Sequence, residues 1–120
     1  MNVLDTSILI QIANETEQGK EITQLLEGQD IAIAMPSYYE FLRGDDSLEA
    51  EKFIESFNIL EFDIESARQS SSIYLDLKAK GKMINELDIL IAGICQSNNA
   101  TLYTLNKDFE KISTLKKVII

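Results

Sequence analysis

The sequence predicts an α/β fold in which helices cover both faces of a central parallel sheet. Short apolar runs such as "DIAIAM" (30–35) carry apolar residues at consecutive rather than alternating positions, as parallel strands buried on both faces do. These runs alternate along the chain with segments of helical periodicity, which is typical of a parallel sheet with crossover helices. The 120 residues, 45% of them apolar, are expected to form one domain over 1–120.

Capping and turn residues predict the first elements. A short strand over Asn2–Leu4 is followed by Thr6, which can cap a helix with apolar residues at helical spacing to about position 14. A second helix is expected over 17–27, and Gly28 suits its end. The β-branched run over 30–35 is then expected to be a buried strand.

Proline and small polar residues mark the middle of the chain. Pro36 is tolerated in the first turn of a helix, which is expected to end near Gly44. Ser47 caps a helix that runs to about position 57, and "NILEF" (58–62) is a short strand. Asp63 caps a long helix that reaches about Lys80.

The last third begins with the turn "GKMINE" (81–86). The nearly all-apolar run 87–98 predicts a deeply buried helix. "TLYTL" (101–105) is a strand, "KDFEKI" (107–112) a short helix and "KVII" (117–120) a final strand.

Composition excludes several chemistries. The chain has no histidine, which excludes histidine catalysis and histidine metal ligation, and its one cysteine, Cys95, cannot form an internal disulfide. The net charge of −9 disfavours nucleic-acid binding through bulk charge, although eight of the 11 basic residues lie in 64–120. No apolar run reaches the length needed to span a bilayer, and no signal-peptide pattern is present, so a cytoplasmic protein with no membrane association is expected.

Acidic residues fall where parallel sheets bind ligands, beyond the carboxyl ends of the strands. Asp5 follows the first strand, Glu40 lies one helical turn past the second, and Asp108 follows the fourth. Asp88 lies in the apolar helix, where a lone carboxylate needs a partner or a metal. If the acids converge, a hard divalent cation relieves their repulsion, and Mg²⁺ or Mn²⁺ is favoured over zinc. Taken singly, Asp5 and Asp108 fit helix caps equally well, and Glu40 fits a surface residue.

Four stretches between Leu4 and Ile112 form a pattern in a fixed order: "LDTSILI", "MPSYYEFLRG", "KGKMINELDILIAG" and "TLYTLNKDFEKI". Together they resemble the PIN-domain ribonucleases, specifically the VapC-type toxins of prokaryotic toxin–antitoxin pairs. The resemblance implies a PIN-like three-layer α/β/α fold with a central parallel sheet of four to five strands. It also implies Mg²⁺-dependent hydrolysis of phosphodiester bonds in structured or single-stranded RNA.

By this resemblance Asp5, Glu40 and Asp88 match three acidic positions that bind metal and catalyse. The family's fourth acidic position is Asn106 here, and Asp108 is expected to take its catalytic and metal-binding role. The residues expected to support ligands or bind substrate are Thr6, Ser7, Arg43, Thr104, Asn106 and Lys107. Caps and turns explain Thr6, Ser7 and Thr104 equally well. Arg43 is expected either to hold a phosphate or to pair with Glu40.

The implied partners are an RNA substrate, a small antitoxin whose C-terminal segment blocks the acidic cleft, and a second copy of the chain. Two alternatives stay open: a stand-alone RNA-processing nuclease, and a catalytically weak PIN fold that acts as an interaction module. A phospho-receiver domain or a haloacid-dehalogenase-like phosphatase is disfavoured, because Thr6 and Ser7 stand where those folds need a further acid.

Overall fold

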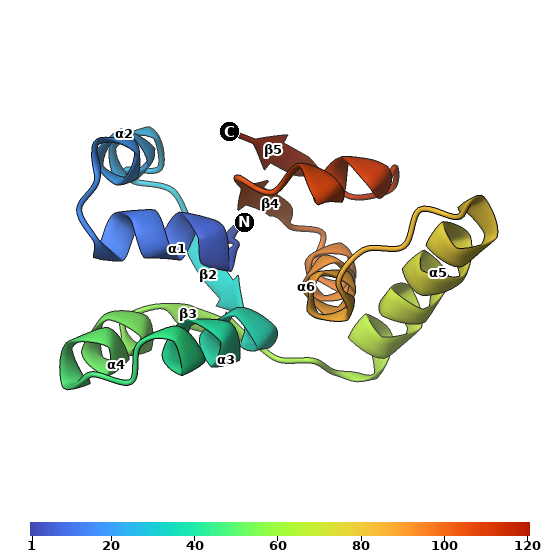
Figure 1. Ribbon diagram of the computed structural model, residues 1–120, viewed down its shortest axis with the longest axis horizontal. Coiled ribbons are helices and arrows are strands. Elements are labelled where there is room, and N and C mark those ends of the chain that lie inside the picture. The colour runs from blue at the N-terminus through green and yellow to red at the C-terminus, as the bar shows by residue number, and fades with distance from the viewer.

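A five-stranded parallel sheet forms the centre of the protein, in a computed structural model that describes residues 1–120 (Figure 1). The strands are β1 (Asn2–Leu4), β2 (Ile31–Ala34), β3 (Asn58–Leu60), β4 (Thr101–Thr104) and β5 (Lys117–Ile119). Their order in the sheet is β3-β2-β1-β4-β5, and every neighbouring pair is parallel. The α/β class and parallel sheet expected from the sequence are confirmed.

Six α-helices and one short 3₁₀-helix connect the strands. They are α1 (Thr6–Ala13), α2 (Glu17–Leu25), α3 (Met35–Gly44), α4 (Leu48–Glu55), α5 (Ile64–Lys80), α6 (Glu86–Ser97) and η1 (Lys107–Lys111). Side-chain oxygens of Ser47 and Asp63 cap α4 and α5, as expected. No helix combines the length and the apolar character that crossing a membrane requires.

Two buried clusters lie on opposite faces of the sheet. Val3, Ala34 and Leu102 of the strands pack with residues of α5, α6 and η1 in one cluster. Leu4 and Ile33, their neighbours in sequence, pack with α1, α2, α3 and α4 in the other. Because successive side chains of a strand point to opposite faces, the consecutive apolar residues of these strands fill both cores.

The site is positioned by the place of β1 in the sheet. From β1 the chain first proceeds outward through β2 and β3, and later returns to the other side of β1 to form β4 and β5. The strand order therefore reverses between β1 and β4, and ligands of open α/β sheets bind beyond the carboxyl ends of strands at such a point. Asp5 directly follows β1 there, and Thr104 is the last residue of β4.

Several boundaries differ from those expected. Asp5, not Thr6, is the N-cap residue of α1, and Thr6 is the first helical residue. The second strand ends at Ala34 because α3 already begins at Met35, and the third ends at Leu60 rather than at position 62. The segment after β4 forms a 3₁₀-helix, the common form for so short a helix.

Candidate metal centre

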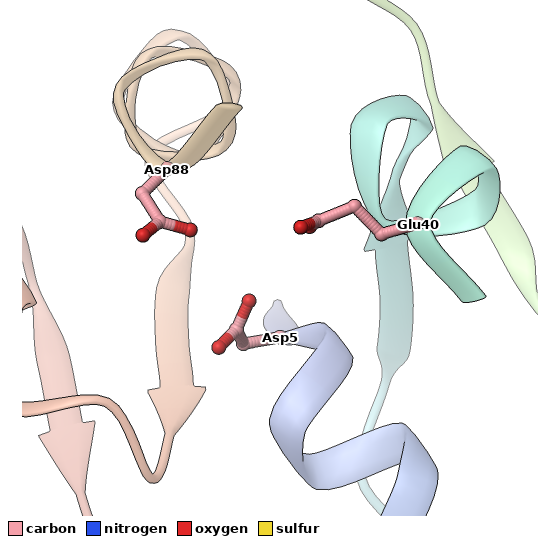
Figure 2. A group of neighbouring side chains, drawn as sticks. All are labelled: Asp5, Glu40 and Asp88. Atoms are coloured by element: carbon pink, nitrogen blue, oxygen red, sulfur yellow. The ribbon is translucent and has the colours of Figure 1, made fainter. Parts of the chain in front are cut away.

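Three carboxylates from three separate elements meet at the carboxyl edge of the sheet. Asp5 precedes α1, Glu40 lies within α3, and Asp88 lies in the first turn of α6. One oxygen of each lies within 4.8 Å of the others, and the three side chains point toward one another (Figure 2). Asp5 and Asp88 are buried, with 4% and 9% of their surface exposed, and Glu40 is half-buried. The sequence-predicted trio is thus brought together.

Asp88 carries a pKa that its surroundings raise. Burial, and then the neighbouring charges of Asp5, Glu40 and Asp108, raise the pKa of Asp88 from 3.8 to about 7. A divalent cation between the carboxylates would remove this repulsion. The donors are all hard carboxylate oxygens, with no nitrogen or sulfur, so the set fits Mg²⁺ or Mn²⁺.

Two hydroxyl groups fix the carboxylate of Asp5. Ser7 Oγ and Thr104 Oγ1 both donate to Asp5 Oδ2, at 2.9 and 2.8 Å. The same hydroxyl oxygens accept hydrogen bonds from the backbone N–H groups of Leu105 and Asn106, at 3.1 and 2.9 Å. The carboxylate makes no capping bond to α1. Asp5 is therefore tied to the turn after β4, with Oδ1 left for a cation.

Glu40 is held by one neutral and one charged neighbour. Thr6 Oγ1 donates to Glu40 Oε1 at 2.9 Å, and Arg43 Nη2 lies 3.7 Å from Glu40 Oε2. The Arg43 side chain is 54% exposed and lies over the ring of Tyr39, 5.1 Å from its centroid. Of the two roles expected for Arg43, the free protein shows the pairing with Glu40. Because the guanidinium is exposed and 3.7 Å from the carboxylate, water screens this pair and weakens it.

The turn after β4 brings Asn106, and not Asp108, to the acidic trio. Asn106 Nδ2 donates to Asp88 Oδ2 at 3.3 Å, and Asn106 Oδ1 accepts the backbone N–H of Asp108 at 3.0 Å. Asp108 Oδ1 lies 3.6 Å from Lys111 Nζ, and the Asp108 side chain is half exposed. Asp108 is near enough to raise the pKa of Asp88 but lies outside the trio, because its side chain turns toward Lys111. Lys107 is exposed at the start of η1.

Sequence reasoning missed two features of the site. One is the hydrogen bond from Asn106 to Asp88. The available signal was the position of Asn106, since an asparagine at a strand end, two residues before an aspartate, is typical of a cap and would have fixed the direction of its side chain. The other is a cleft of about 250 Å³ between α1 and α3, lined by Ile10, Ala13, Asn14, Glu40, Phe41, Gly44 and Asp45. Its walls come from segments about 30 residues apart, which no local pattern connects.

The family model and the similar proteins that match this chain all point to the same family. Residues 3–115 match the family model described as PIN domain. "Ribonuclease VapC1" of Methanocaldococcus jannaschii is 33% identical over an alignment of 115 positions that covers 92% of this chain and 79% of that protein.

Solved structures similar to this chain also come from VapBC proteins. The chain is similar to VapBC2 from Rickettsia felis bound to a DNA fragment from their promoter, with a TM-score of 0.85 and 25% identity, covering 98% of this chain and 97% of that one. DNA-bound VapBC from Salmonella typhimurium gives a TM-score of 0.82 and 26% identity, covering 98% and 96%. VapBC-1 from nontypeable Haemophilus influenzae gives 0.78 and 27%, with the same coverage.

Proposed function

Because the chain belongs to the PIN-domain family and to its VapC-type branch, we propose that it is a Mg²⁺-dependent endoribonuclease, the toxin of a VapBC-type toxin–antitoxin pair. The observation that carries the proposal is the acidic trio Asp5, Glu40 and Asp88, whose oxygens lie within 4.8 Å of one another at the sheet edge. The M. jannaschii relative is named a ribonuclease, and Mn²⁺ fits the same oxygen ligands as Mg²⁺.

Each residue of the site has a proposed task in cleavage. When bound, the metal polarises the phosphodiester and lowers the pKa of a bound water. Asp5 and Asp88 hold the ion, and Glu40 holds it or orients the attacking water. Ser7 and Thr104 keep Asp5 in place, and Thr6 keeps Glu40 in place.

Arg43 is proposed to bind a phosphate of the RNA. Its guanidinium is exposed and its ion pair with Glu40 is 3.7 Å long, so exchange for a phosphate costs little. A guanidinium can hold two phosphate oxygens at once. Lys107 is exposed at the start of η1, shortly after the carboxyl end of β4, and adds positive charge there.

The proposed partner is a small antitoxin whose basic C-terminal segment lies in the cleft beside Glu40. Three similar structures are VapBC complexes. The cleft is lined by Glu40 and Asp45, and α1 and α3 both end beside it, at Ala13 and Gly44. The C-terminal ends of helices attract cations, so a lysine or arginine side chain suits this cleft. We propose a homodimer in the cytoplasm as the working form.

Two other functions keep some support. A stand-alone RNA-processing nuclease would need the same acidic trio, and the absence of a neighbouring antitoxin gene would favour it. A catalytically weak interaction module is favoured by one observation, the neutral Asn106 at the fourth position.

Cleavage of a labelled RNA separates a nuclease from a catalytically weak interaction module. The wild-type protein should cut with Mg²⁺ and stop with EDTA, and Glu40→Gln should lose the activity with its fold unchanged by circular dichroism. Glu21→Gln, which removes the same charge from an exposed position of α2, is the matched control and should cut normally. Cleavage by Glu40→Gln at the wild-type rate would contradict the proposed site.

A further inference from the structure

The side-chain amide of Asn106 has only one orientation that its neighbours accept. Its Oδ1 lies 3.0 Å from the backbone nitrogen of Asp108, which can only donate, so the atom there must be the oxygen. Its Nδ2 lies 3.3 Å from Asp88 Oδ2, and the ionised carboxylate, the form that binds a cation, can only accept. Turning the amide over would set donor against donor and acceptor against acceptor. The amide therefore presents N–H, and not its carbonyl oxygen, to the acidic trio.

This orientation is coupled to the local fold. Asn106 is the N-cap residue of η1, and its oxygen satisfies the free N–H of Asp108 at the first turn. To offer that oxygen to a cation, Asn106 would have to release the cap. Asp108 does not replace it as a ligand, because its carboxylate lies beside Lys111.

We infer that Asn106 is a positioning residue and not a metal ligand: its Nδ2 holds Asp88 Oδ2 in place, so that Asp88 offers its other oxygen to the cation. The inference rests on the proposed function in one respect, that a divalent cation binds the trio. Two consequences follow. The turn after β4 supplies no ligand, and the protein ligands of the ion come only from among Asp5, Glu40 and Asp88.

The backbone N–H of Asp108 reports directly on the orientation of Asn106. In the ¹⁵N-labelled full-length protein, its proton shift and its hydrogen exchange are measured without metal and with saturating Mg²⁺. If Asn106 remains a positioning residue, this N–H keeps its hydrogen bond and stays protected in both states. If the amide oxygen turns to the ion, the proton shift moves upfield and protection is lost, which overturns the inference.

A pair of variants separates positioning from simple capping. Asn106→Ser keeps a good cap but is too short to reach Asp88, so Mg²⁺ affinity measured by calorimetry should fall about tenfold, as for other groups that orient a metal ligand. Asn106→Asp keeps the cap and also loses the N–H to Asp88, but it places a negative charge beside the trio. The attraction of this charge for the cation outweighs the lost bond, so its affinity should rise. If Asn106→Ser binds Mg²⁺ with the wild-type affinity, Asn106 acts only as a helix cap and the inference is overturned.

The outcomes distinguish this inference from the proposed function. If Mg²⁺ produces no heat and no shifts near Asp5 and Asp88, the metal site itself is wrong, and the inference falls with it. If Mg²⁺ binds but the Asp108 N–H is released, the proposed function stands and the role of Asn106 is wrong. Retained cutting by Asn106→Ser with an unchanged Mg²⁺ requirement would also count against positioning.

Discussion

Replacing Asp88 by asparagine should stabilise the metal-free protein while it removes metal binding. Burial and the charges of Asp5 and Glu40 raise the pKa of Asp88 from 3.8 to about 7. Since the folded state holds this proton more tightly than the unfolded chain, stability is lost as the pH rises from about 4 to about 7. Asparagine has nearly the same shape and no charge, so Asp88→Asn should recover the lost stability.

The structure sets the size of the effect. A rise in pKa from 3.8 to about 7 corresponds to at most about 4 kcal/mol above pH 7. Because part of the carboxylate contacts water, which screens the repulsion, the gain expected for Asp88→Asn is about 2 kcal/mol. For 120 residues that is a rise in Tm of about 8 °C. At about pH 5 the folded wild-type Asp88 is already protonated, and the gain should fall to about 1 kcal/mol.

Thermal unfolding followed by circular dichroism, with EDTA present, measures both values. Asp46→Asn is the matched control, since Asp46 is exposed, and its Tm should change by less than about 2 °C. Adding Mg²⁺ should raise the Tm of the wild type and leave Asp88→Asn unchanged, because only a protein that binds the ion is stabilised by it. An Asp88→Asn variant less stable than the wild type at about pH 8 without metal would refute the reasoning.

Four further outcomes are expected. The Mg²⁺ affinity of the wild type, measured by calorimetry, should rise between about pH 5 and about pH 8 as Asp88 loses its proton, and a flat profile would contradict the raised pKa. Asp108→Asn should weaken Mg²⁺ by less than about threefold, since Asp108 lies outside the trio, whereas Asp5→Asn should remove binding; equal losses would make Asp108 a ligand. Thr104→Val should lower the free energy of unfolding by about 1–3 kcal/mol in urea, because it removes the bond to Asp5 and leaves the Asn106 N–H unpaired, and an unchanged midpoint would contradict that network. Light scattering should give about twice the 13.5 kDa chain mass, and a monomer at micromolar concentration would remove the proposed dimer.

The sequence predicted the fold well because its signals are local. Ser47 and Asp63 act as caps where expected, and the apolar runs form the five strands. Boundaries were less accurate where two elements share residues. Met35 fits both the strand before it and the helix after it, and only the position of Pro36 in the first turn decides between them.

The acidic trio could be predicted, but its surroundings could not. Asp5, Glu40 and Asp88 each follow a strand or interrupt an apolar helix, and a parallel sheet brings such positions to one edge. The direction of Asp108 depends on a single turn, whose hydrogen bond from the Asp108 N–H to Asn106 leaves the carboxylate beside Lys111. A sequence pattern gives the spacing of such residues and not the dihedral angles that aim them.

The donors around the trio show why its charge is left for a cation. Asp5, Glu40 and Asp88 each accept a hydrogen bond from a neutral group, namely the hydroxyls of Ser7, Thr104 and Thr6 and the amide of Asn106. These groups orient the carboxylates without neutralising them. The single basic partner is Arg43, which is exposed and 3.7 Å from Glu40. Buried charges in proteins are usually paired with an opposite charge, but no lysine or arginine lies among the two buried acids and the half-buried Glu40. The arrangement instead keeps the repulsion in the metal-free protein, and so makes a divalent cation the partner that completes the site.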